Sequence, residues 1–409
     1  MRQPTIFLFC FFALISCKEE TTEPLEEMFV LRVPADYPTN NTDNWVMLHD
    51  LNGSLLDHKS FESGDTMVFQ FTNSEITDQF IVTLFEYLQE NGFTYYNLNS
   101  YSAIAQKQEW ELTTSQKPTS TINNTIIGNF TLTVTDASQI FTKSLTARSG
   151  RWSSWPIQNV ATQNIYEGDS SFLLSVETDL GNPRYKFLEN VTDQGSYEVS
   201  FINEMSEFDK KIDVTFPPTK DILLIITGYE KDQPMNGFGY ELYNNLLFPN
   251  TVTRSSISLG FLNRFDRYST SLKVGYSGLE YIYSKKGSIP TSISLPLHME
   301  FELIDKSLGN YSYTYSEGFS MRKTRYFHKD INNSYSINWD VFAPPIDTRI
   351  KELPDNFANL YPQFQLDKPV HYVTDFYVQH NVSYNDFIDI NFKGKKSVQT
   401  DDIYIISLK

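Results

Sequence analysis

The fold class is decided by residues 80–96, which read FIVTLFEYLQENGFTYY. Apolar residues in the first half of this stretch lie four apart, a spacing that suits one face of a helix. However, Ile81-Val82-Thr83 are β-branched, and Asn91-Gly92 separates two apolar runs. Asn-Gly tolerates the positive φ angles of a two-residue turn and is the strongest short-range hairpin signal. We therefore expect two antiparallel strands here.

Short apolar or alternating runs separated by polar turns continue through the rest of the chain, which predicts an all-β protein. Residues 351–360 are the one short stretch where we expect a helix, with Pro354 near its start. The expected strands outside the hairpin cover residues 29–33, 45–50, 67–71, 130–134, 171–176, 197–202, 212–216, 222–226, 256–261, 271–276, 279–283, 297–303, 311–315, 335–341, 370–377, 387–392 and 403–408.

The spacing of these strands is typical of antiparallel β-sandwiches, and we expect two or three such modules in tandem. A linker rich in Thr, Ser and Asn at residues 113–124 separates the first module from the second, and Pro217-Pro218 closes the second. The expected boundaries are residues 29–116, 125–218 and 219–409, the last being the largest domain.

The first module combines a strand, an Asp and Gly turn at residues 50–53, and Gly64 before an alternating strand. In this respect it resembles a carboxypeptidase-regulatory-like or transthyretin-like β-sandwich. That resemblance spans roughly 45 residues and implies a sandwich fold.

The amino terminus carries a short apolar run that ends in Leu14-Ile15-Ser16-Cys17. The run follows Arg2 and is too short to span a bilayer, so it indicates a cleaved signal over residues 1–16. The pattern resembles the lipobox of bacterial lipoproteins. The resemblance implies that the Cys17 thiol is acylated, for example with palmitate, and becomes the first mature residue. An ordinary signal with a chance cysteine is the alternative.

Lys18-Glu19-Glu20 follow the cysteine and resemble the export tag of Bacteroidetes-type surface lipoproteins. This implies an outer-membrane protein, held by lipid, that faces the cell exterior. Residues 17–28 are polar and acidic, and we expect them to form a flexible lipidated tether. The membrane, contacted through the lipid anchor, is then one expected partner.

Composition excludes several classes of function. The 409 residues carry a formal charge of −17, and removing Arg2 with the signal leaves 32 basic against 50 acidic residues, or −18. Such a surface repels phosphates, so we expect no nucleic-acid partner. Cys10 and Cys17 are the only cysteines. A mature chain without a free thiol has no disulfide, thiol nucleophile or cysteine metal site, and we expect no cofactor and no metal.

Two tryptophans in an expected loop next to Arg151, Trp152 and Trp155, are the candidate ligand contacts, because loops are exposed. The alternative is that they fold back as lids on a core, as loop tryptophans often do. His298, Glu300 and Glu302 alternate with apolar residues in the expected strand 297–303. One histidine and two carboxylates could bind a cation, but a solvated strand face gives the same spacing, and we favour the latter.

Tyr311, Tyr313 and Tyr315 share one strand face and either stack on sugars or, as we favour, belong to a core. Gly275-Tyr276-Ser277-Gly278 departs from a serine-hydrolase elbow, and the acidic positions around Asp386 lack the glycine and glutamate of a calcium loop.

No catalytic motif is complete. We therefore expect a binding or accessory role at the cell surface, rather than an enzyme, with a glycan or an outer-membrane protein complex as partner. The alternative is a glycan-active hydrolase whose paired carboxylates lie far apart in sequence.

Overall fold

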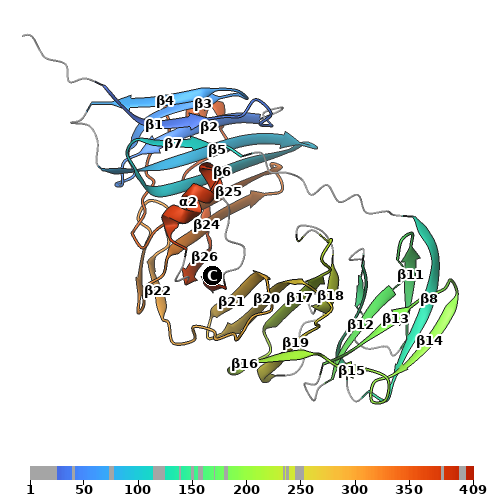
Figure 1. Cartoon of the computed structure of the whole chain (residues 1–409). Coiled ribbons are helices and arrows are strands. Elements are labelled where there is room, and N and C mark those ends of the chain that lie inside the picture. Colours follow the sequence, from blue (N-terminus) through green and yellow to red (C-terminus); the bar gives the residue numbers. More distant parts are fainter. Residues whose placement is uncertain are drawn as a thin grey trace, which may run out of the picture.

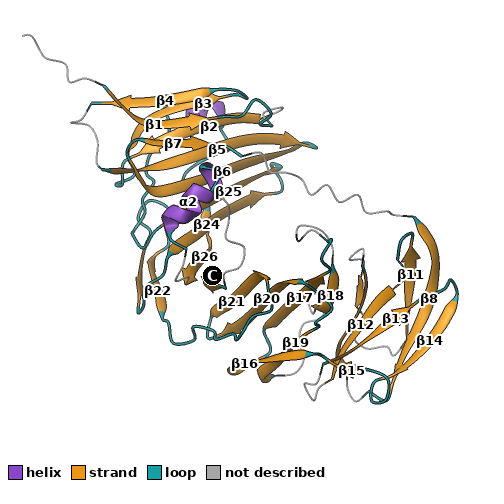
Figure 2. Ribbon diagram, in the orientation of Figure 1, coloured by secondary structure: helices purple, strands orange, loops and turns teal. Residues whose placement is uncertain are grey.

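The structure is a computed structural model, and strands make up most of it. It describes residues 25–38, 42–72, 78–113, 125–137, 140–148, 152–154, 160–169, 171–178, 183–233, 235, 239–244, 253–378, 382–395 and 402–409. The all-β prediction is confirmed: the described chain contains many strands and two short helices, α1 (Phe357–Leu360) and α2 (Tyr384–Phe392). Figure 2 shows how far strands outnumber helices. The expected signal peptide, Cys17 and residues 114–124 of the expected linker lie outside the described residues.

One long sheet of twelve strands organises the molecule (Figure 1). Neighbouring strands pair antiparallel except β25 and β6, which pair parallel. In spatial order the strands are β18 (Tyr240–Asn244), β17 (Ile222–Tyr229), β20 (Arg267–Tyr276), β21 (Leu279–Gly287), β27 (Ile403–Leu408), β26 (Val370–Val378), β24 (Met321–Asp330), β25 (Tyr335–Ala343), β6 (Phe93–Ala105), β5 (Gln79–Glu90), β2 (Thr42–His49) and β3 (Leu55–Phe61).

A three-stranded sheet and helix α2 pack on one end of the long sheet. The small sheet contains β4 (Thr66–Phe71), β1 (Glu26–Arg32) and β7 (Gln108–Glu111). Trp110 of β7 stacks on Phe392 of α2 with ring centroids 4.1 Å apart, and Tyr101 of β6 packs edge-on against the same Phe392 ring. α2 therefore packs against both sheets of this sandwich through Phe392.

Residues 126–207 form a second sandwich. Its five-stranded sheet contains β10 (Trp152–Ser154), β9 (Ile140–Ala147), β12 (Ser171–Thr178), β13 (Arg184–Glu189) and β15 (Ser206–Glu207), and the three-stranded sheet contains β11 (Val160–Tyr166), β8 (Ile126–Thr135) and β14 (Gly195–Ser200). Phe130, Leu132, Phe172 and Leu174 are buried in the core that these strands share. Figure 1 shows this lobe beside the β18 end of the long sheet.

Two short sheets complete the described fold. β16 (Lys210–Thr219) pairs with β19 (Arg254–Phe261), and β22 (Phe301–Asp305) pairs with β23 (Ser312–Tyr315). β16 packs over the β17 half of the long sheet, where Val214, Leu224 and Leu259 are buried together.

The expected division at residues 29–116, 125–218 and 219–409 stays a prediction, and two pairings run across it. β6 and β25 join strands of the first and third blocks in one sheet. β16 runs through Pro217 and Pro218, where the register shifts, and pairs with β19 of the third block. The expected first and third domains are thus hydrogen-bonded to each other along almost the whole of β25.

The hairpin prediction at residues 80–96 is confirmed. Glu90 pairs with Phe93, and Asn91 and Gly92 take φ angles of +52° and +77°. The motif at Gly275–Gly278 also forms a tight turn, between β20 and β21, with Ser277 and Gly278 at positive φ. A hairpin turn has no strand-to-helix elbow, so this serine lacks the setting of a hydrolase nucleophile.

Several sequence expectations need correction. Residues 387–392 were expected as a strand, but they belong to α2. Ser383 accepts a hydrogen bond from the backbone NH of Asp386, whose side chain accepts one from Ser383 in return, and this capping box starts the helix. The short helix expected at residues 351–360 is present as α1, and Phe357 donates its NH to the Pro354 carbonyl. The expected tether is too long, because β1 already begins at Glu26.

Candidate functional site

Of the predicted site residues, the structure describes only the backbone of Trp152. Trp152 lies in strand β10, opposite Thr146 of β9, rather than in the expected loop. The structure does not describe the Trp152 side chain, Trp155 or Cys17.

The strand expected at residues 297–303 begins only at Phe301, because Met299 donates its NH to the Pro296 carbonyl in a turn. His298 is exposed and lies 3.2 Å from Glu317, while Glu302 lies on the strand. Across the described ranges, no group of three or more His, Cys, Asp and Glu side chains could hold a metal ion.

The three tyrosines divide between the two expected roles. Tyr311 is fully buried, and its hydroxyl lies 2.7 Å from Thr374 Oγ1. Tyr313 is half-buried against Phe376. Tyr315 is 44% exposed at the end of β23. The core interpretation holds for Tyr311, and the row does not form a flat exposed platform.

The best candidate lies on one face of the long sheet, where β5, β6, β25, β24 and β26 run side by side. Polar and apolar residues alternate along these strands, and because successive side chains point to opposite faces of a sheet, the polar ones gather on one face. In β25, Ile337, Trp339 and Val341 are buried, whereas Asn338 and Asp340 are half-buried. We call this surface the polar sheet face and define it by Glu86, Asn97, Lys323, Arg325, Asn338, Asp340 and Asp375.

Amide and carboxylate groups on the polar sheet face form a row across three strands. Asn338 donates to Asn97 Oδ1 at 3.2 Å, and Asn97 donates to Glu86 Oε2 at 3.1 Å. Asn99 lies opposite Asp340 in the β6–β25 register. Because these groups are planar and half-exposed, each retains lone pairs or NH groups for a ligand.

Charged groups continue the row onto β24. Arg325 donates Nε to one oxygen of Asp340 at 2.8 Å and Nη2 to the other at 3.1 Å. Lys323 lies 2.8 Å from the same carboxylate. Burial opposes ionisation of Asp340, but hydrogen bonds from Arg325 and Lys323 outweigh it and lower the pKa of this carboxyl group.

Asp375, on the other side of β24, has the opposite shift. Burial raises its pKa, and the hydrogen bond from Ser407 together with the charge of Lys323 only partly offsets this. Asp375 lies opposite Lys323, and Asp340 lies opposite Arg325, so the two carboxyl groups flank one strand on the same face. Their pKa values are therefore shifted in opposite directions.

Aromatic side chains border this polar row. Phe93 and Tyr95 of β6 have centroids 5.0 Å apart, and Phe327 of β24 lies 6.1 Å from Tyr372 of β26. Tyr372 is 55% exposed. Phe327 is the partner of Asn338 in the ladder, so rings and amides are neighbours.

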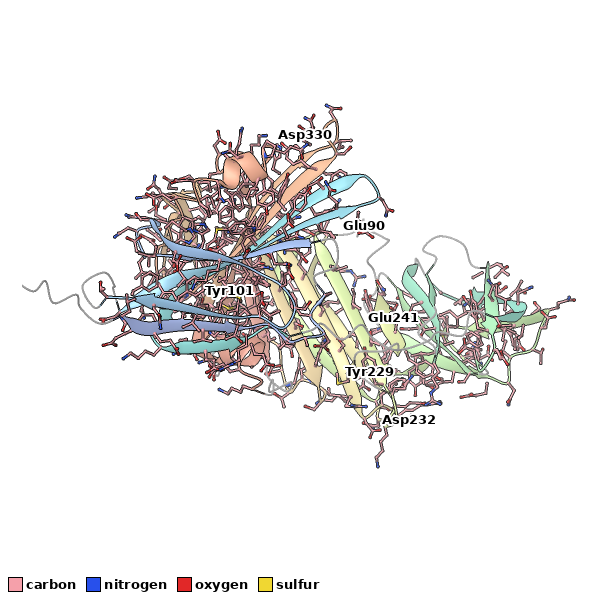
Figure 3. The ribbon with its side chains drawn as sticks, turned by 90° about the horizontal axis from the view of Figure 1, so that it is seen from above. Glu90, Tyr101, Tyr229, Asp232, Glu241 and Asp330 are labelled. Carbon is pink, nitrogen blue, oxygen red and sulfur yellow. The ribbon has the colours of Figure 1, made fainter. Side chains whose placement is uncertain are left out.

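The tips of two hairpins extend beyond these rings. Glu90 ends β5 and Asp330 ends β24, and Thr94 donates its NH to Ser334 between the two tips. Figure 3 shows Glu90 and Asp330 at the edge of the part of the molecule that contains these hairpins, with Tyr101 inside it.

Sequence reasoning missed the polar sheet face because its partners are remote in the chain. Asn97 and Asn338 are separated by 241 positions. The available signal was local: Asn97, Asn99, Asn338 and Asp340 occupy every second position in strands with large apolar residues between them. Which strands are neighbours cannot be derived from that alternation.

No protein-family model matches the chain, and no curated protein matches it significantly. Among the described residues, neither helix is long and apolar enough to cross a bilayer.

Proposed function

We propose that this protein is an acylated outer-membrane lipoprotein that faces the cell exterior and binds a glycan through the polar sheet face. The observation that carries the binding role is the row of half-buried amide, carboxylate and guanidinium groups beside exposed aromatic rings. Planar polar groups can pair with neighbouring hydroxyls in two hydrogen bonds, and aromatic rings can cover the apolar faces of sugars. The support for the anchor is the lipobox ending in Cys17.

Binding is tested by titrating a panel of soluble polysaccharides into the protein and comparing variants. Asn338→Ala removes the central amide of the row, and Asn263→Ala, at an exposed asparagine after β19, is the matched control. We expect the first variant to lose at least tenfold in affinity, which corresponds to about 1.4 kcal/mol, and the control to bind as the parent does. Equal affinities would refute the assignment of the site.

The anchor is tested separately by metabolic labelling with palmitate. Label should enter the parent chain and be absent from Cys17→Ser, and globomycin should block signal cleavage. An unlabelled parent chain would refute the lipoprotein proposal and leave the binding proposal intact.

Glycan hydrolysis is the second candidate, favoured by one observation. Asp340 and Asp375 share a face and have pKa values shifted in opposite directions, as an acid and base pair requires. Both oxygens of Asp340 already accept hydrogen bonds from cationic groups, so we prefer binding. Turnover of any polysaccharide that disappears in both Asp340→Asn and Asp375→Asn would establish the hydrolase instead.

A further inference from the structure

A cavity lies on the opposite side of β26 from Asp375. It has a volume of about 720 Å³ and is formed by the start of β26, the loop before β23 and the segment before α1. Its walls include Lys306, Leu308, Ile350, Lys351, Leu366 and His371. This volume lies within the range of sites that accept small organic ligands, and the aliphatic wall suits an apolar body.

Positive groups outnumber negative ones around this cavity, although the chain as a whole is acidic. Lys306 and Lys351 contribute two ammonium groups, whereas Asp367 is the one carboxylate in its described wall. The whole chain carries a formal charge of −17. Lys306 Nζ lies 3.5 Å from the backbone oxygen of Lys409, which leaves it further donors. An anion therefore meets local attraction here that most of the surface does not provide.

A chain of hydrogen bonds runs from the cavity wall to a buried cation. His371 Nε2 lies 2.9 Å from Thr374 Oγ1, which lies 3.4 Å from Thr324 Oγ1. Arg322 donates to that Thr324 hydroxyl at 2.7 Å. Arg322 is fully buried, its guanidinium lies 4.3 Å over the Tyr311 ring, and it forms no ion pair with any carboxylate in the described part of the chain.

This arrangement places uncompensated positive charge behind the cavity. A buried charge is screened less than an exposed one, so its potential reaches further. Burial and the neighbouring Lys306 lower the pKa of His371 to about 4, which keeps its ring neutral at pH 7 and able to hydrogen-bond.

We propose that this cavity binds an amphipathic carboxylate, with its head group between Lys306 and Lys351 and its apolar body against Leu308, Ile350 and Leu366. The inference extends the binding role proposed above to a second ligand class. It stands on the cavity alone and needs neither the lipid anchor nor the polar sheet face.

The test is calorimetric titration of decanoate into the full chain carrying Cys17→Ser, which removes the acylated sulfur. Decanol, of equal chain length and no charge, should bind at least tenfold more weakly than decanoate. The double variant Lys306→Gln/Lys351→Gln should also lose at least tenfold. Lys286→Gln, at an exposed lysine of β21, is the matched control and should bind decanoate normally.

A further variant avoids any effect on the core. Val370 lines the cavity and is 64% exposed, so Val370→Asp adds a negative charge at little cost in stability. It should weaken decanoate binding and leave decanol unaffected. The proposal is overturned if decanoate does not bind at millimolar concentration, if decanol binds equally well, or if the lysine and Val370 variants bind like the control.

Discussion

We expect one buried ion pair to join the second sandwich to β19 of the short β16–β19 sheet. Glu177 of β12 is 1% exposed, and Arg254 of β19 is 8% exposed. Arg254 donates to Glu177 Oε1 at 2.5 Å, and the Tyr243 hydroxyl of β18 donates to the other oxygen. Figure 3 shows Glu241, from the same strand as Tyr243, where the two lobes meet. Replacing one partner leaves the other charge buried without compensation.

The magnitude follows from burial. Glu177→Met or Arg254→Met should each cost about 3–5 kcal/mol, because the remaining charge keeps its desolvation penalty and loses its partner. The double variant should cost less than either single one, since two methionines need no counter-ion. Burial raises the pKa of Glu177, and the charge of Arg254 only partly offsets this.

Urea unfolding of the four proteins, followed by tryptophan fluorescence and far-ultraviolet circular dichroism, completes the double-mutant cycle. Glu207→Met provides the control, because Glu207 of β15 is 65% exposed, pairs with Lys211 at the surface and should leave the urea midpoint almost unchanged. Additive losses in the double variant, or single-variant losses no larger than the control's, would refute the reasoning.

Three further outcomes are expected. His49 is buried and its pKa is lowered to about 4, so its contribution to stability is fully present above pH 6.5, where the ring is neutral in both the folded and the unfolded chain. The free energy of unfolding should fall by roughly 3 kcal/mol as the pH drops from 6.5 to 4, because the unfolded chain then binds a proton that the folded chain does not. In His49→Gln the urea midpoint should depend less on pH over this range. Ser383→Ala removes the N-cap of α2 and should cost about 1 kcal/mol in urea unfolding, whereas Ser307→Ala, in an exposed turn, should cost less than half as much. Trp339→Phe removes the 2.8 Å hydrogen bond from the indole to Ser100 in the core, and a loss of about 1–2 kcal/mol is expected; an unchanged midpoint would mean that this bond contributes no net stability.

Turns and strand alternation could be predicted from the sequence, but the pairing of strands that are remote in the chain could not. The Asn91-Gly92 turn and the strand alternation follow from backbone preferences within a few residues. The start of helix α2 also has a local signal, since Ser383 and Asp386 have the spacing of a capping box, but the apolar residues at 387–392 favour a strand when they are considered alone.

The candidate site depends on which strands are neighbours in the sheet. In the sequence Asp340 is an ordinary strand residue, and only the fold places Arg325 of β24 beside it. Arg322 likewise has the pattern of a surface cation, yet the fold buries it completely. Neighbouring strands in a sheet are chosen by the packing of the whole chain, so alternation shows that a polar face exists but not what it contains.

The parallel pairing of β6 with β25 has a consequence for the order of assembly. The Tyr335–Ala343 strand is translated some 240 positions after its partner, and until it arrives β6 presents a bare row of amide and carbonyl groups. The long sheet can therefore form completely only late, after the long intervening segment has been closed into a loop. This favours slow folding. A chain cut before residue 335 should keep its first hairpin and still tend to aggregate through that open edge.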